Sequence, residues 1–251
     1  MGKVEERTLP ILDRWDPPLR PARLIRRYKR FLADVEMDGQ ADPVTVHCPN
    51  PGAMTGCAEP GMRVLLAPVA NPKAKLPWRW VLSETVEGVM IGIDTTRANR
   101  IAAALLARRA IPELAEWPEW RAEVVYDDGN SRVDFLLTDP RTRCPPLYLE
   151  VKSVTLRRDD RLQFPDAPTR RGTRHLRALA RIAAGGEARA AVLYLAQRDD
   201  GACFSLARDI DPAYALAHEE AARAGVMTLA RQLRLTQTAV HDAGPLPLEE
   251  A

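Results

Sequence analysis

The sequence has no long apolar run, and this absence argues against a membrane-spanning helix. The apolar run at residues 101–107 is far shorter than the about 18 residues that a span requires. The N-terminal residues also lack the apolar stretch of a secretory signal. We therefore expect a soluble, cytoplasmic protein that makes no contact with a membrane.

Cysteine is scarce, since the 251 residues include only 4. So few thiols are too sparse for a disulfide framework in a chain of this length. None of them forms a Cys-x-x-Cys pair, and the spacing of His47, Cys48 and Cys57 matches no zinc motif. The pattern favours small buried thiols in a reducing compartment over a zinc site.

Neither sign of charge dominates, because 36 Lys and Arg face 34 Asp and Glu, so net charge identifies no partner. The balance hides a basic segment at 20–30, which holds six cations and no acid. Apolar residues interleave with these cations, which predicts a strand or short helix with one face on a core. Such blocks of charge are usually solvated surface. No acid offsets this one before Asp34, however, and an anionic partner is an equally weighted alternative.

Hydrophobic residues make up 46% of the chain, which suffices for a buried core and allows one large domain or two small ones. Proline and glycine punctuate residues 40–80, and short β-like segments lie between them at 43–47, 63–68 and 78–82. Short strands at this spacing predict a small β-barrel, and the size suits an OB-type barrel. We assign this domain to residues 1–88.

The pattern changes after Gly92, where helical and strand-like segments alternate. The predicted order is α-β-β-β-α-β, with segments at 99–115, 122–126, 131–138, 147–155, 172–184 and 190–196. A last helix at 212–224 and a closing element at 226–235 follow. The expected fold is therefore α/β (α+β): an OB-like barrel, then a mixed sheet flanked by helices at 89–241. A polar tail at 242–251 is expected to be flexible.

Three charged residues interrupt the apolar strands of the second domain. Asp134 lies in one strand, and Glu150 and Lys152 project to the same side of the next. Two carboxylates from adjacent strands can hold Mg²⁺ or Mn²⁺, and a lysine beside them can orient water or stabilise a phosphate. The alternative is a salt-bridge ladder on a sheet face. No organic cofactor is indicated.

Six stretches of the chain match one known family in the right order. They read RRYKRF at 26–31, HCPNPGAMTGC at 47–57, NPKAKLP at 71–77, SRVDFLL at 131–137, YLEVKSVTL at 148–156 and FPDAPTRRGTRHL at 164–176. On these motifs the sequence resembles the sugar fermentation stimulation protein A family over roughly residues 24–235.

The resemblance implies an OB-like barrel, a PD-(D/E)XK nuclease-like (restriction-endonuclease-like) domain, and DNA binding without sequence specificity. It also implies an association with the regulation of sugar (maltose) metabolism. Carried over, Asp134 and Glu150 match metal-binding positions, and Lys152 matches the catalytic lysine. The chain departs from the nuclease pattern twice: Val133 replaces the proline before Asp134, and the first helix has no acid near Ile101. Neither Glu113 nor Glu123 is an obvious substitute for that acid, and its absence favours one-metal chemistry, weak activity or none.

Polar and basic side chains in three places are candidates for contacts with phosphates. They are Arg26, Arg27, Lys29 and Arg30 in the basic segment, Asn50, Lys73 and Lys75 in the barrel, and Arg170, Arg171, Arg174 and His175 near the second helix. Trp78 could stack on a base, but filling the core is the commoner fate of tryptophan. His175 could be a general acid, although a lone histidine is more often structural. We expect Asp166 to cap the second helix.

Three functions therefore remain open. The first is a DNA-binding protein that contacts the backbone, so that its affinity falls steeply with salt. The second is a Mg²⁺- or Mn²⁺-dependent nuclease that acts on DNA or RNA. The third is a transcriptional co-regulator in which the nuclease core is only a scaffold. The sequence leaves the oligomeric state open.

Overall fold

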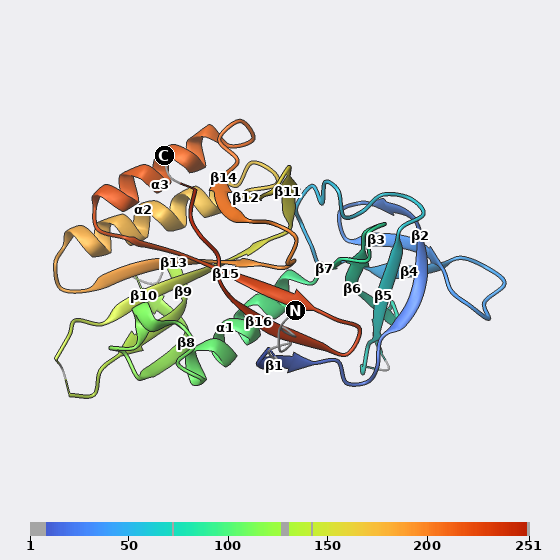
Figure 1. The fold of residues 1–251 in the computed structure, drawn as a ribbon, viewed down its shortest axis with the longest axis horizontal. Helices are drawn as coiled ribbons and strands as arrows, with labels where there is room; N and C mark the ends of the chain where they lie inside the picture. Colours follow the sequence, from blue (N-terminus) through green and yellow to red (C-terminus); the bar gives the residue numbers. More distant parts are fainter. Residues whose placement is uncertain (1–8, 72, 127–130, 142, 250–251) are drawn as a thin grey trace, which may run out of the picture.

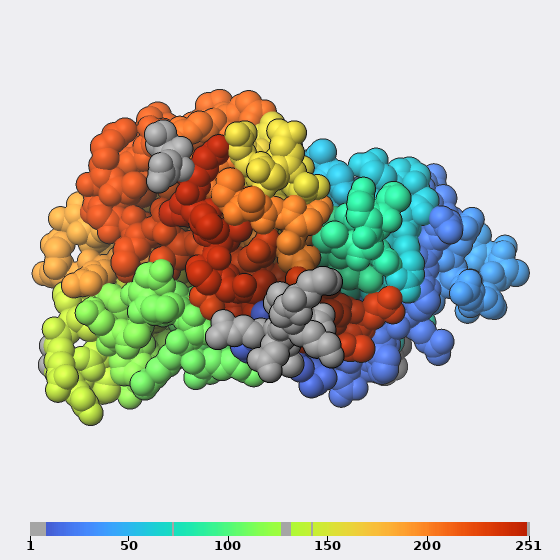
Figure 2. Space-filling view, in the orientation of Figure 1, coloured from blue at the N-terminus to red at the C-terminus, as the bar shows by residue number. Residues whose placement is uncertain are grey.

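The computed structural model describes residues 9–71, 73–126, 131–141 and 143–249, with the side chain of Ser131 excepted. Its ribbon shows a smaller β-rich part and a larger part built on a twisted sheet (Figure 1). The space-filling view shows the same division into two lobes (Figure 2). Within the described ranges, no helix is long and apolar enough to cross a membrane.

The smaller part is a closed barrel of the expected OB-like kind. Its sheet has the order β4-β3-β2-β5-β6-β7, and a further pairing of β4 with β6 closes a ring of β2 to β6. The strands are β2 Arg20–Tyr28, β3 Leu32–Glu36, β4 Val44–His47, β5 Arg63–Pro68, β6 Trp78–Glu84 and β7 Met90–Gly92. In β2, Ala22 and Leu24 are buried, and Pro21 and Arg23 beside them are exposed, so the basic segment is a strand with one face on the core.

The larger part is a mixed sheet with helices on both faces. Its strand order is β1-β16-β15-β13-β10-β9-β8, in which the β10–β13 and β13–β15 pairs are parallel. The strands are β1 Ile11–Arg14, β8 Glu119–Tyr126, β9 Ser131–Thr138, β10 Leu147–Val154, β13 Arg189–Ala196, β15 Met227–Leu235 and β16 Ala239–Pro245. A small sheet joins β11 Leu156–Arg158, β12 Arg161–Phe164 and β14 Cys203–Leu206. This architecture confirms the expected fold class.

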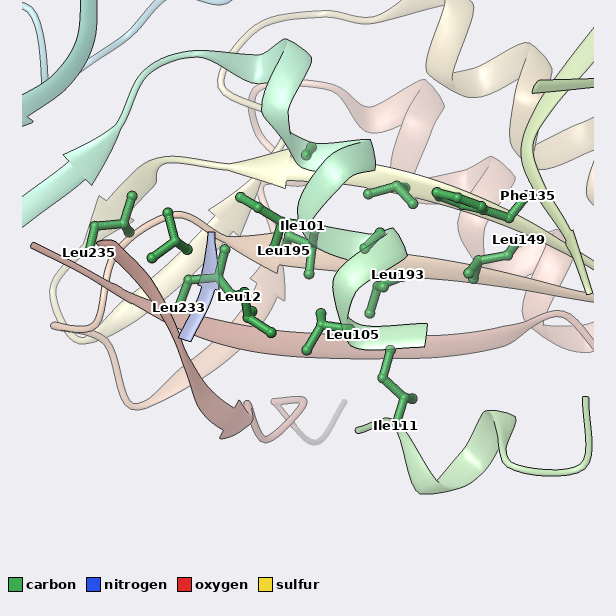
Figure 3. Packing of buried hydrophobic residues seen from close by; sticks show 14 of the residues in the cluster. Leu12, Ile101, Leu105, Ile111, Phe135, Leu149, Leu193, Leu195, Leu233 and Leu235 are labelled. Carbon is green, nitrogen blue, oxygen red and sulfur yellow. The ribbon is translucent and has the colours of Figure 1, made fainter. Parts of the chain in front are cut away.

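The helices divide between the two faces of the large sheet (Figure 1). On one face lies α1, Ala98–Ala107, whose Ile101 and Leu105 pack among Leu149, Leu193 and Leu195 (Figure 3). On the other face lie α2, Arg170–Ala184, and α3, Pro212–Arg223. Odd-numbered residues of β10 and β13 therefore face α1, and even-numbered residues face α2 and α3.

Helix α1 is shorter than the predicted segment at 99–115. It ends at Ala107, and a separate 3-10 turn, η2, occupies Pro112–Leu114. Arg109 has a φ of 51°, and Ala110 donates its backbone N–H to Leu105 O at 3.0 Å. A residue in the left-handed region with such a bond terminates a helix, so the predicted helix is wrong beyond Ala107, before Pro112, the proline that was expected to weaken or end its last turn.

The domain boundaries also differ from those predicted. The N-terminal strand β1 pairs with β16 and belongs to the large sheet, although it lies within 1–88. Strand β7 pairs with β6, so the barrel continues to Gly92. The expectation of a flexible tail from Asp242 is wrong for 242–245, because β16 includes these residues and Asp242 forms a buried ion pair with Arg231 at 2.7 Å. Residues 250–251 lie outside the described residues.

Candidate functional site

Three strands bring acidic side chains into one row across the large sheet. In the β8–β9 hairpin, Ala122 pairs with Phe135 and Val124 pairs with Val133. Glu123 of β8 therefore lies opposite Asp134 of β9. The β9–β10 ladder ends at Leu149 and Phe135, and just beyond it Asp134 contacts β10 through the Val151 backbone N–H and lies close enough to Glu150 for the two charges to interact. Lys152 lies on the same face of β10 as Glu150, and Asp134 lies at the end of the ladder, where Asn99 of α1 also reaches it. The structure thus places the three sequence-predicted residues Asp134, Glu150 and Lys152 together.

Asp134 is held by donors from two elements. Its Oδ2 accepts the backbone N–H of Val151 at 2.7 Å, and its Oδ1 accepts Nδ2–H of Asn99, near the start of α1, at 2.8 Å. Burial, and then the neighbouring charge of Glu150, raise the pKa of Asp134. The ionised form of Asp134 is therefore disfavoured, and a nearby cation would relieve that cost.

Glu150 is only 4% exposed and has two nitrogen partners. Its Oε1 accepts a hydrogen bond from Lys152 Nζ at 2.6 Å and also contacts His175 Nδ1. Burial by itself would raise the pKa of Glu150, but Lys152 and His175 outweigh it and lower the pKa. The Lys152 side chain is 12% exposed, so its ammonium group is held beside the carboxylates rather than extended into water.

Asn99 was missed from the sequence, and Glu123 was set aside there as no obvious substitute for the missing acid. Asn99 donates Nδ2–H to Asp134 and, at 3.3 Å, to Oε1 of Glu123. Glu123 also has a φ of 54°, a conformation that costs about 1–3 kcal/mol in a residue other than glycine. Carboxylates directly opposite each other repel, and the Asn99 amide lies between these two. A careful count of the hairpin register would have placed Glu123 opposite Asp134.

Helix α2 brings His175 to the site and begins differently from our expectation. Thr169 is the N-cap, and its Oγ1 accepts the backbone N–H of Gly172 at 3.1 Å. The expectation that Asp166 caps this helix is therefore wrong. His175 Nε2 accepts Nε–H of Arg171 at 3.3 Å, while its other ring nitrogen faces Glu150. The structure thus places His175 in the carboxylate site.

Asp166 instead joins the barrel to the larger part. Its Oδ2 accepts the backbone N–H of Met54 at 3.0 Å. A Cβ at Gly52 would lie 2.3 Å from the same oxygen, so only glycine fits there without a shift. On the other side, Pro49 O accepts Oγ1–H of Thr95 at 2.9 Å, just before α1. The barrel loop at 49–57 therefore lies between the segments that lead into α1 and α2.

Two residues that the sequence analysis assigned to nucleic-acid contacts, Arg27 and Asn50, instead make hydrogen bonds with backbone groups of this loop. The Arg27 guanidinium donates to the backbone oxygens of Asn50 at 2.8 Å, Gly52 at 2.9 Å and Ala53 at 3.3 Å. Asn50 is 3% exposed, its Nδ2 donates to Ile93 O at 3.3 Å, and its Oδ1 accepts from Gly52 at 2.9 Å. The expectation that Asn50 contacts nucleic acid is wrong, because its amide is buried and bonded within the chain.

The other predicted cations lie on the surface. Arg26 is ion-paired with Asp34 at 2.8 Å and lies over the Tyr28 ring at 5.0 Å. The other basic residues that were predicted to contact phosphates are exposed: Lys29 and Arg30 in the β2–β3 turn, Lys73 and Lys75 in the β5–β6 connection, and Arg170, Arg171 and Arg174 on α2. These cations therefore form separate patches on the barrel and beside the carboxylate row.

The donor chemistry of the row suits a hard cation. In the part of the chain that the structure describes, no three His, Cys, Asp or Glu side chains gather into a complete metal site. Mg²⁺, however, is usually held by one or two carboxylates together with waters and substrate phosphates. Asp134 and Glu150 are a pair of this kind, and burial together with the charge of Glu150 raises the pKa of Asp134.

Comparisons with known proteins match nearly the whole chain. The family model described as SfsA N-terminal OB domain matches residues 25–93, and that described as sugar fermentation stimulation protein RE domain matches residues 96–239. A sugar fermentation stimulation protein homolog of Ruegeria sp. strain TM1040 is 49% identical over 93% of this chain and 99% of its own length. The homolog of Dinoroseobacter shibae is 46% identical over 95% of this chain and 96% of its own length.

One solved structure also matches. It is titled as SfsA of Pyrococcus furiosus in complex with Ca²⁺, and it aligns with a TM-score of 0.82 at 25% identity. The alignment covers 93% of this chain and 97% of that one.

Proposed function

Because the chain belongs to the sugar fermentation stimulation protein family, we propose that it binds DNA without sequence specificity and carries a nuclease-like cation site. The barrel and α2 would contact the phosphate backbone, and Asp134 and Glu150 would hold the cation. The observation that carries the proposal is the carboxylate row with Lys152 beside it. Fold alone would not support it, because function depends on the site.

The residues of the row have distinct roles in the proposal. Asp134 and Glu150 would hold Mg²⁺ or Mn²⁺, and the bound ion would stabilise negative charge on a phosphate. Asn99 and the Val151 amide fix the orientation of the Asp134 carboxylate. Lys152 Nζ can donate to a water or to a phosphate oxygen that enters beside Glu150. No organic cofactor takes part.

The Pyrococcus furiosus relative supports the proposal of a cation site. That protein was solved in complex with Ca²⁺, which takes carboxylate and carbonyl oxygens as ligands. The same oxygen chemistry is present here in Asp134 and Glu150. We therefore expect Ca²⁺, Mg²⁺ and Mn²⁺ to compete for one site.

Exposed cations carry the DNA-binding part of the proposal. Arg170 and Arg174 extend from α2, the helix whose His175 contacts Glu150. Contacts of this kind read the phosphate backbone and carry no sequence information. RNA remains an alternative ligand, because its backbone presents the same charge.

Hydrolysis of phosphodiester bonds is a second candidate, which the close approach of Lys152 to Glu150 favours. Under this candidate, the chain would be a Mg²⁺- or Mn²⁺-dependent nuclease. A regulatory role in sugar (maltose) metabolism is also part of the proposal, since the relatives carry the name sugar fermentation stimulation protein.

The salt dependence of binding tests the proposal. The affinity for double-stranded and single-stranded DNA would be measured from about 50 to 200 mM salt. We expect the double variant Arg170→Ala/Arg174→Ala to lower the slope of log affinity against log salt by about 2, because each phosphate contact contributes about 1. The control is Arg108→Ala, an exposed cation just after the far end of α1. An affinity that does not change with salt would contradict the proposal.

A further inference from the structure

A hollow of about 540 Å³ lies where the chain enters the barrel. Its walls include Pro17 and Pro18 from the segment between β1 and β2, and Arg20, the first residue of β2. Pro68, the last residue of β5, and Trp78, the first of β6, pair with each other and form the opposite wall. The Trp78 hollow, as we call it, is therefore built by two segments that are far apart in the sequence.

One indole and several proline rings dominate the lining of the Trp78 hollow. Trp78 is partly buried and packs against the barrel core on one side, which leaves the rest of the indole to the hollow. Proline rings provide much of the remaining wall, and proline has no backbone N–H to satisfy. Such a lining offers stacking and apolar contact to a flat ligand, and no described acidic residue contributes to it.

One cation lines the hollow, and two more lie within five residues of Trp78 in the sequence. Arg20 lines the hollow, and Lys73 and Lys75 are exposed in the connection that leads into Trp78. Among the described residues, none of these three side chains has a hydrogen bond or ion pair. The neighbourhood is therefore both aromatic and positively charged, which matches a flat ring that carries phosphates.

We propose that the Trp78 hollow holds one unpaired nucleobase, stacked on the indole, with the adjoining phosphates on Arg20, Lys73 and Lys75. The inference rests on the proposed function, because it assumes that the chain binds nucleic acid. It also goes further, because a base inside a duplex is already stacked and cannot enter. The protein should therefore prefer single-stranded or unpaired DNA to intact duplex. A proline-rich or aromatic peptide would leave the three cations without a partner.

An abasic oligonucleotide separates the base from the backbone. The test compares a thymidine oligonucleotide with an abasic one of the same length and phosphate charge. Wild-type protein should bind the thymidine form about tenfold more tightly, the effect of one stacked base. Trp78→Leu should lower that affinity to the abasic level and leave the abasic affinity unchanged. Arg20→Ala should weaken both, because it removes a phosphate contact.

Two control variants test whether the preference for thymidine over abasic DNA depends on an aromatic ring at position 78. Trp78→Phe keeps a ring and should retain most of the preference for thymidine over abasic DNA. Phe31→Ala removes an exposed ring from the β2–β3 turn of the same barrel and should leave the preference unchanged. In wild-type protein, an oligonucleotide with one 5-iodouracil should crosslink under light to Trp78. That measurement needs no variant to fold.

The outcomes distinguish this inference from the proposed function. If wild-type protein binds thymidine and abasic DNA equally, backbone binding stands and the base site is refuted. An unchanged preference in Trp78→Leu, or crosslinks that map only elsewhere, also refutes the base site. If wild-type protein binds neither oligonucleotide at low salt, the proposed function fails as well. Displacement of the oligonucleotide crosslink by a proline-rich peptide, without any base preference, would assign the hollow to a peptide instead.

Discussion

A divalent cation should raise the melting temperature of wild-type protein and should not raise that of Asp134→Asn. Burial and the charge of Glu150 raise the pKa of Asp134, so ionisation of this carboxyl opposes folding at neutral pH when no cation is bound. A cation on Asp134 and Glu150 removes the opposition and adds its own binding free energy. The stabilisation therefore depends on both carboxylates.

The size of the shift follows from mass action. At a cation concentration of about 100 times the Kd, binding contributes about 2.7 kcal/mol. For a chain of this size, each kcal/mol moves the melting temperature by about 2–4 °C, so the expected rise is about 5–11 °C. The assay is thermal unfolding, followed by circular dichroism, with Mg²⁺, Mn²⁺ or Ca²⁺ against EDTA.

A matched acidic variant controls for general effects of the cation. Glu119→Gln removes an exposed carboxylate from the start of β8, the same strand that carries Glu123, and it should keep the full rise. The reasoning is refuted if Asp134→Asn shows the same rise as wild type, or if wild type shows none at saturating cation.

Other predictions concern the same site and the junction of the two parts. Without a cation, Asp134→Asn should gain stability relative to wild type as pH rises above about 4, because the pKa of Asp134 is raised in the folded state and wild type loses stability when this carboxyl ionises. Urea unfolding between pH 4 and 8 measures the difference in unfolding free energy between the two proteins, and a difference that stays constant with pH would contradict the prediction. Asn99→Ala should cost about 1–3 kcal/mol in urea unfolding, since it removes the donor between Asp134 and Glu123, and a neutral effect would exclude that role. Glu123→Gln should weaken Mn²⁺ binding in calorimetry, and an affinity equal to that of wild type would place Glu123 outside the site. Gly52→Ala should lower the free energy of unfolding by about 1–3 kcal/mol, and much of this loss should disappear in an Asp166→Ala background. If the effects of the two substitutions simply add, the 2.3 Å approach of the new Cβ to Asp166 Oδ2 is not the cause of the loss.

Local patterns in the sequence predicted much of the fold. The strand at 131–138 has the bounds of β9, and the apolar run at 190–196 differs from β13 by one residue. Alternation and turn residues determine such strands, because each face of a strand has its own environment. Asp134 and Glu150 could be placed together for the same reason.

Long-range pairing could not be predicted in this way. The pairing of β1 with β16 joins the two ends of the chain, and nothing within residues 11–14 indicates their partner. The burial of Asn50 depends on acceptors and donors at Ile93 and Gly52, which local sequence does not bring together. Glu123 was set aside because its place in the site depends on the hairpin register and on an amide from another element, Asn99.

The measurement that tests the central claim most directly is the effect of Mg²⁺ on DNA binding by wild type and by Asp134→Ala, at about 50 and 200 mM salt. We predict that affinity falls steeply with salt in both proteins, and that Mg²⁺ at constant ionic strength raises affinity in wild type alone. Nicking of circular DNA in the same samples would report on the nuclease candidate, with Lys152→Ala as a further variant. An affinity that ignores salt, or an equal Mg²⁺ effect in both proteins, would contradict the account.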